Sequence, residues 1–101
     1  MDELPPGFTW DQRKARENTR KHDVSFVAAA GVFDDPAGLL EADPVHSEDE
    51  ERLRLIGRSS QGQVLLIVFV ERRDTIRIIS ARLARRSERI RYEQEAQERG
   101  Y

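Results

Sequence analysis

The sequence predicts a small α+β domain with two N-terminal helices, an antiparallel sheet of three to four strands and a C-terminal helix. Residues 52–82 contain three short apolar runs of β type, separated by turn-like breaks. Two helix start signals precede residue 35, and the residues after position 83 are good helix formers without Gly or Pro. Helices and strands that are grouped separately along the chain are typical of the α+β class.

The length and composition fit one domain over residues 1–101, in which residues 1–7 form a loose lead-in. The absence of cysteine excludes disulfides and thiolate metal sites, and it fits the reducing cytoplasm. The longest apolar run, Val64–Val70, has the length of a strand, so we expect no membrane span, and no signal-peptide pattern is visible. Together these features predict a cytoplasmic protein. No metal or cofactor motif is present, so we expect no cofactor.

Two N-cap residues define the first two predicted helices. Asp11 begins a strongly polar helix that should run to about His22. Ser25 begins a second, apolar helix, which should end at residues 34–36, where the sequence is Asp-Asp-Pro. Four residues share one face of this helix, and we expect that face to dock under the sheet: Phe26, Ala29, Ala30 and Phe33.

The predicted strands cover Leu53–Ser59, Gln63–Glu71 and Thr75–Arg82, and hairpin-sized connections join them. The middle strand is apolar on both faces, so it should be buried at the centre of the sheet. Phe8–Trp10 and Leu39–Leu40 are candidate edge strands. A final helix is expected within residues 83–98, and we expect the helices to lie on one face and at one end of the sheet.

Charge is divided unevenly along the chain. Residues 1–51 contain 13 acidic and 5 basic side chains, whereas residues 52–101 contain 6 acidic and 12 basic side chains. All basic residues of the second half are arginines, and a guanidinium can bind phosphate through two parallel hydrogen bonds. A phosphate-bearing partner would explain this pattern, although a solvated arginine surface would explain it as well.

Five arginines are candidates for binding an extended polyanion such as single-stranded RNA. Arg58 and Arg82 end the first and third predicted strands, and Arg54 shares a strand face with Arg58. Strict alternation along the third strand places Arg77 on the face opposite Arg82. Arg86 adds a fifth positive charge in the final helix.

The alternative is that these arginines cover a half-buried sheet and pair with Glu71, Asp74 or the acidic loop of residues 43–51. Lys21 and His22 form a further basic pair at the end of the first helix, where the helix dipole favours cations. Histidine can also move a proton near neutral pH. A site with two histidines would require His46 to approach His22, and the sequence does not indicate that it does.

Short motifs follow one another in a fixed order along the chain: Phe8-Thr9-Trp10-Asp11, Asn18-Thr19-Arg20-Lys21-His22, Val24-Ser25-Phe26, Val32-Phe33-Asp34-Asp35-Pro36, His46-Ser47, Glu50-Glu51-Arg52, Leu55-Ile56-Gly57-Arg58-Ser59, Ile78-Ile79-Ser80-Ala81-Arg82, Glu88-Arg89 and Tyr92-Glu93. Together they resemble the BrnT family of bacterial toxins, over about Phe8 to Glu93. No single motif is diagnostic, but the ordered set is specific.

The resemblance implies a RelE-like fold and an endoribonuclease that cleaves RNA without metal and blocks translation, within a type II toxin–antitoxin system. It implies a BrnA-like antitoxin with a ribbon-helix-helix domain, which would neutralise the toxin and bind operator DNA in a complex of two toxins and two antitoxins. The ribosome is a further candidate partner. The motif positions that carry over as catalytic candidates are Lys21, His22, Arg58 and Arg82.

In the expected mechanism, the RNA 2′-hydroxyl attacks the adjacent phosphate. Arg58 and Arg82 would hold that phosphate, while Lys21 or His22 assists proton transfer; Glu71 is an alternative base. The competing hypothesis is a non-catalytic binding module whose arginine face binds an acidic partner or DNA in a repressor complex. The chain departs from the family at Asp23, where glycine is usual, so we expect modest strain there if the backbone is left-handed.

Overall fold

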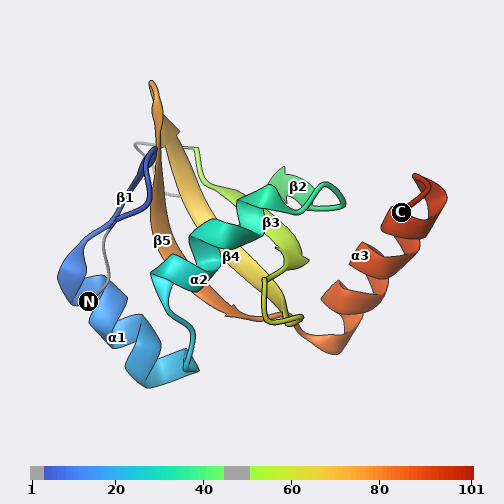
Figure 1. The fold of residues 1–101 in the computed structure, drawn as a ribbon, viewed down its shortest axis with the longest axis horizontal. Helices are drawn as coiled ribbons and strands as arrows, with labels where there is room; N and C mark the ends of the chain where they lie inside the picture. Colours follow the sequence, from blue (N-terminus) through green and yellow to red (C-terminus); the bar gives the residue numbers. More distant parts are fainter. Residues whose placement is uncertain (1–3, 45–50) are drawn as a thin grey trace.

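The computed structural model describes residues 4–44 and 51–101, which form a five-stranded sheet with helices on both sides (Figure 1). In chain order the elements are β1 (Phe8–Thr9), α1 (Gln12–His22), α2 (Phe26–Gly31), the 3₁₀ turn η1 (Val32–Asp34), β2 (Leu39–Ala42), β3 (Leu53–Arg58), β4 (Val64–Arg72), β5 (Thr75–Leu83) and α3 (Arg86–Glu98). The sheet order is β1-β5-β4-β3-β2. The α+β class is confirmed, with more strands than expected because both candidate edge strands form.

The two predicted helix starts are confirmed by their capping bonds. The Asp11 carboxylate accepts hydrogen bonds from the backbone N–H groups of Arg13, at 2.8 Å, and Lys14, at 3.2 Å. The Ser25 hydroxyl accepts one from the N–H of Ala28 at 3.0 Å. Each cap satisfies N–H groups that have no partner inside the helix, which fixes where the helix begins.

The sheet has an apolar core on each face. Between the sheet and the N-terminal helices, Phe26 and Ala29 pack with Leu65 and Ile67 of β4. On the opposite face, Leu66 of β4 packs with Ile56 of β3 and with Tyr92 and Ala96 of α3. The expectation that the helices share one face is therefore wrong, because both apolar faces of β4 need cover.

A β-bulge interrupts β5. Val68 of β4 is opposite Ser80, whereas the next residue, Phe69, is opposite Ile78, so Ile79 is an extra residue without a partner in β4. The bulge shifts the alternation of side chains along β5. Ile78 therefore lies in the same core as Ala81, whereas strict alternation along the strand predicts that it shares the face of Arg82; that prediction is wrong.

The final helix begins at Arg86, since β5 continues through Leu83. Its buried residues are Glu88, Tyr92 and Ala96, whereas Leu83 and Ile90 are exposed. The side of α3 that meets the sheet is therefore partly polar, which explains why its apolar stripe is weak in the sequence. No helix in the described part of the chain is long and apolar enough to cross a membrane.

Two glycines offer a matched test of the packing beneath β3. A Cβ at Gly57 would lie 2.7 Å from the Val32 side chain and 3.2 Å from the Asp35 carboxylate, whereas a Cβ at Gly31 would meet nothing within 4 Å. Gly57→Ala should lower the free energy of unfolding by about 1–3 kcal/mol through overpacking. Gly31→Ala should raise it by up to about 1 kcal/mol, because alanine favours the helix. Urea unfolding of both variants measures these changes; equal effects would contradict the close packing at Gly57.

Candidate functional site

Three of the candidate arginines lie on the sheet face that α3 covers. Arg58 is opposite Val64, and Arg54 is opposite Val68, on the same side of the sheet as Leu66. Arg82 is opposite Leu66 in β5 and therefore shares that face. The structure thus brings Arg54, Arg58 and Arg82 together beneath one helix, with carboxylates close to each of them.

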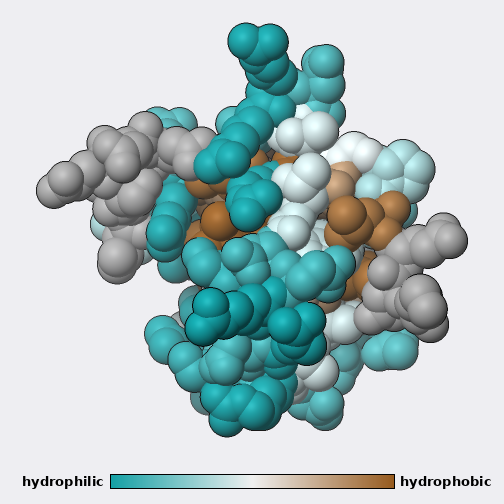
Figure 2. Space-filling view, turned by 90° about the vertical axis from the view of Figure 1, so that its left-hand side faces the viewer, coloured by the Kyte–Doolittle hydropathy of each residue, from teal (hydrophilic) through white to brown (hydrophobic). Residues whose placement is uncertain are grey.

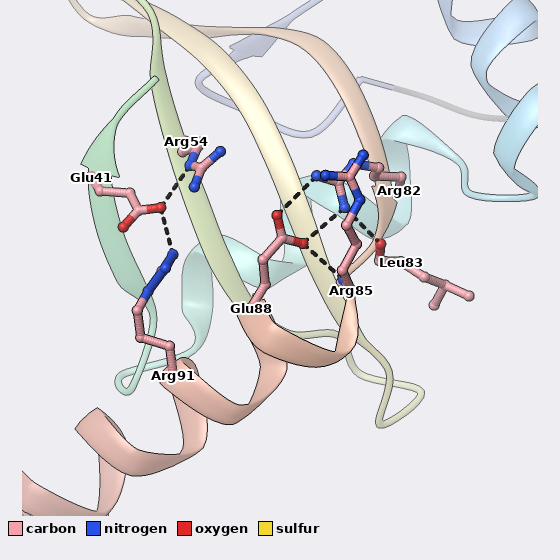
Figure 3. A network of polar contacts seen from close by, with 7 residues as sticks. All are labelled: Glu41, Arg54, Arg82, Leu83, Arg85, Glu88 and Arg91. Atoms are coloured by element: carbon pink, nitrogen blue, oxygen red, sulfur yellow. Dashed lines mark hydrogen bonds and ion pairs between the residues drawn. The ribbon is translucent and has the colours of Figure 1, made fainter. Parts of the chain in front are cut away.

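Arg82 is held by Glu88 of α3 in a bidentate ion pair (Figure 3). The guanidinium nitrogens lie 2.9 and 3.0 Å from the two carboxylate oxygens, and the Arg85 N–H also donates to Glu88, at 2.8 Å. These hydrogen bonds, with Arg82 as the largest cause, lower the pKa of the buried Glu88 to about 2. Such a pair fixes the plane of the guanidinium, so Arg82 has a defined orientation.

Arg54 belongs to a second ion-pair group, centred on Glu41 of β2 (Figure 3). Glu41 accepts from Arg54 at 2.6 Å and from Arg91 of α3 at 2.8 Å. One carboxylate therefore joins the edge strand, a central strand and the C-terminal helix. Arg54 is largely buried in this group, and the Glu41 carboxylate compensates its charge inside the protein.

Arg58 is the most exposed of the three arginines. Its guanidinium donates to the Gly62 carbonyl at 2.9 Å, lies 3.6 Å from Glu93 and stands over the Tyr92 ring. Its backbone N–H donates to Asp35, which also accepts from the Tyr92 hydroxyl at 2.6 Å. Burial acts to raise the pKa of Asp35, but these hydrogen bonds outweigh it and keep that pKa below its ordinary value. An open cleft of about 380 Å³ lies beside Arg58.

Lys21 and His22 lie in a groove between α1 and β5. This α1–β5 groove is open to solvent, has a volume of about 180 Å³, and is lined in part by Lys14, Asn18, Lys21, His22, Ile79 and Ser80. Ile79 is the bulged residue of β5, so the bulge helps to form the groove.

Asn18 fixes the position of α1 against β5. Its side-chain N–H groups donate to the carbonyls of Val24, at 2.9 Å, and Ala81, at 2.8 Å, and its oxygen accepts from the Ala81 N–H at 3.1 Å. The amide therefore satisfies backbone groups of β5 beyond the short β1, which pairs only with Ile76 and Arg77. Lys21 and His22 follow Asn18 by three and four residues, on the same side of the helix.

The four catalytic candidates lie in two places: Arg58 and Arg82 beneath α3, and Lys21 and His22 in the α1–β5 groove. Within the described residues, no hydrogen bond or ion pair joins Lys21 or His22 to Arg58 or Arg82. Asn18, bonded to Ala81 next to Arg82, connects the two places.

The remaining candidates are dispersed. Arg77 is half-buried in β5, and the bulge places it on the face of Arg82 rather than opposite, so that expectation is wrong. Arg86 is exposed in the first turn of α3. Glu71 is opposite Ile76 near the far end of the β4–β5 hairpin, so it is remote from Arg58 and Arg82. His46 lies outside the described residues, and the part of the chain that is described contains no cluster of three or more potential metal ligands.

Sequence reasoning missed Asn18, Glu88 and the pair formed by Asp35 and Tyr92. Each is a polar residue whose role depends on a contact distant in sequence, such as the 63 positions between Asn18 and Ala81. The available signal was their presence in the ordered motifs, where Asn18 stands three residues before Lys21.

Comparisons with known proteins agree with this architecture. Residues 10–88 match the model of a family described as the ribonuclease toxin BrnT of type II toxin–antitoxin systems. Among solved structures, the chain is similar to the ribonuclease toxin BrnT of Brucella abortus, with 21% sequence identity and a TM-score of 0.58, over 78% of this chain and 96% of that one. A search of curated proteins gives no match.

Glu88→Gln should reduce stability in a pH-dependent way. A pKa that falls from 4.5 to about 2 on folding corresponds to about 3 kcal/mol, which is fully present above pH 4.5 and is lost as the pH falls towards 2. The variant should therefore be clearly less stable than the parent at neutral pH, and the difference should shrink in acid. Urea unfolding across this range measures it, with Glu93→Gln, at an exposed residue, as the control. A difference independent of pH would contradict the ion pair.

Asp23→Gly should stabilise the end of α1. Asp23 has φ 55° and ψ 36°, the left-handed conformation, which confirms the condition under which strain was expected. Glycine adopts this conformation without steric cost, so the free energy of unfolding should rise by about 0.5–1 kcal/mol. Thermal unfolding measures this change. The removed negative charge next to Lys21–His22 should also increase RNA cleavage, and an equal cleavage rate would argue against an effect of Asp23 on the site.

Proposed function

Because the chain belongs to the BrnT family, the ribonuclease toxins of type II toxin–antitoxin systems, we propose that it cleaves RNA by attack of a 2′-hydroxyl on the adjacent phosphate. The observation that carries this proposal is the family match over residues 10–88, which includes all four catalytic candidates. The similarity to a solved BrnT structure supports the same fold.

In the proposed reaction, the 2′-oxygen forms a bond to phosphorus while the bond from phosphorus to the 5′-oxygen breaks. A base removes the 2′-hydroxyl proton, and an acid protonates the leaving 5′-oxygen. The products are a 2′,3′-cyclic phosphate and a 5′-hydroxyl. The nucleophile is part of the substrate, so the protein has to orient the phosphate, move protons and stabilise charge.

Arg58 and Arg82 are suited to stabilise the negative charge that builds on the phosphate oxygens. Arg58 is partly exposed beside an open cleft, and Arg82 is oriented by Glu88. Lys21 or His22 is the proposed proton carrier, since both are exposed in the α1–β5 groove. RNA would have to contact both the α1–β5 groove and the arginines beneath α3 to use all four. Glu71 is less suited as a base because of its distance from the arginines.

The proposed partners follow from the family. A BrnA-like antitoxin with a ribbon-helix-helix domain would neutralise the toxin in the cytoplasm, in a complex of two toxins and two antitoxins, and would alone contact operator DNA. Arg54, Arg77 and Arg86 are proposed to add RNA contacts. The ribosome is a further proposed partner, because it would present messenger RNA to the toxin.

A second candidate function is a binding module without catalysis. One observation favours it: Arg54, Arg58 and Arg82 each have a carboxylate partner within the protein, as structural ion pairs do. On this hypothesis the arginine face contacts an acidic segment of the antitoxin or the operator DNA.

Cleavage of a labelled single-stranded RNA distinguishes the two functions. The parent protein should cleave it in the presence of EDTA and should leave a 2′-O-methyl substrate intact, because the nucleophile is blocked. Arg58→Ala should reduce kcat/KM by about 10²–10³-fold, the usual cost of removing a donor that stabilises transition-state charge. Reactions with and without ribosomes, analysed by gel and by the chemistry of the 3′ end, measure these effects.

Arg82 needs a compensated variant, because its loss would leave the buried Glu88 carboxylate unpaired. Arg82→Ala combined with Glu88→Gln removes both charges, and Glu88→Gln alone is the matched control. If a protein with Arg58→Ala, Arg82→Ala and Glu88→Gln still cleaves RNA at the parent rate and inhibits growth without antitoxin, the arginine-based mechanism is wrong. A parent protein that binds RNA without cleaving it would favour the binding module.

A further inference from the structure

We infer that the α1–β5 groove binds the phosphate backbone of single-stranded RNA, with Lys14 and Ser80 as contacts in addition to Lys21 and His22. This inference rests on the proposed function, because it assigns the path of that substrate. Four observations carry it: the spacing of the cations on α1, their freedom from ion pairs, the side chains that β5 presents and the polar character of this side of the molecule.

The cations of α1 are spaced along one side of the helix. Lys14 and Lys21 are seven residues apart, which is about two turns, so they lie on the same face at a separation of about 10 Å. His22 extends this line at the C-terminal end of α1. A row of this kind can follow consecutive phosphates of an extended strand, whereas a small anion would need convergent donors.

These side chains are available to a ligand. Within the described residues, neither Lys14, Lys21 nor His22 forms a side-chain ion pair, and all three are exposed. The contrast is with Arg54 and Arg82, whose charges Glu41 and Glu88 compensate. A phosphate that binds these side chains therefore has no carboxylate partner to displace, whereas a phosphate that binds Arg82 must compete with Glu88.

The β5 side of the groove offers a hydroxyl donor and a fixed wall. The bulge brings both Ile79 and Ser80 into the lining, although strict alternation would point neighbouring residues to opposite faces. The Ser80 hydroxyl can donate to a phosphate oxygen. Asn18 is already bonded to Val24 and Ala81, so it sets the width of the groove instead of binding the ligand.

The groove also contains one acidic side chain. Glu17 lines it but pairs with Arg20 at 2.9 Å, which compensates its charge. Figure 2, which faces the side of the molecule where α1 lies, shows a surface dominated by hydrophilic side chains with smaller apolar areas between them. This polar character fits a solvated polyanion better than an apolar partner.

Binding of a fluorescent 2′-O-methyl oligonucleotide tests the inference independently of cleavage, because this probe keeps the phosphates and blocks the nucleophile. Fluorescence anisotropy at several salt concentrations gives the number of phosphate contacts. Lys14→Gln should weaken binding severalfold and reduce the slope of log affinity against log salt by about 0.7, the value for one contact on a single strand. Ser80→Ala should weaken binding without changing the slope, since it removes no charge.

Arg13→Gln is the matched control, because it removes one positive charge from α1 next to Lys14 but outside the lining of the groove. Equal effects of Arg13→Gln and Lys14→Gln would show a general charge effect and would overturn the inference. Preferential binding of a polyglutamate peptide, with the same dependence on Lys14, would identify a protein-docking groove and would also overturn it. Groove-dependent binding by a protein that cleaves no RNA would uphold the inference while refuting the proposed ribonuclease activity.

Discussion

The fold depends on one side-chain amide, that of Asn18. Because β1 pairs with only two residues of β5, the backbone groups of Ala81 would otherwise face the protein interior without partners. Asn18 satisfies both of them and also binds the Val24 carbonyl, where the chain turns from α1 to α2. A buried polar group without a partner costs about 1–3 kcal/mol, so this one residue joins helix, turn and sheet in a single arrangement.

The ion pairs beneath α3 form a second layer of organisation on the opposite face. The contact between α3 and the sheet combines a small apolar core with the carboxylates of Glu41 and Glu88, each of which binds arginine. A helix held in this way needs oriented charges as well as hydrophobic burial. The arginines that suit phosphate therefore also stabilise the fold, and their two roles have to be separated by compensated variants.

The sequence predicted the parts of this structure that local chemistry determines. The caps at Asp11 and Ser25 and the central position of β4 were predicted correctly, because capping and apolar runs act over short distances. The placement of α3 was not predicted correctly. It depends on contacts such as the pair of Glu88 with Arg82 of β5, and these depend on the sheet register. The site was predicted as a set of residue types, but the position of the α1–β5 groove depends on Asn18 and on the bulge, neither of which has a local signature.

The bulge at Ile79 also affects how this chain should be compared with its relatives. A relative whose last strand lacks the extra residue keeps strict alternation, so an alignment without gaps would pair core positions of one protein with surface positions of the other. A one-residue gap placed at Ile79 restores the match on both sides. In this part of the chain, a sequence profile that ignores the gap would report divergence where the side-chain environments are the same.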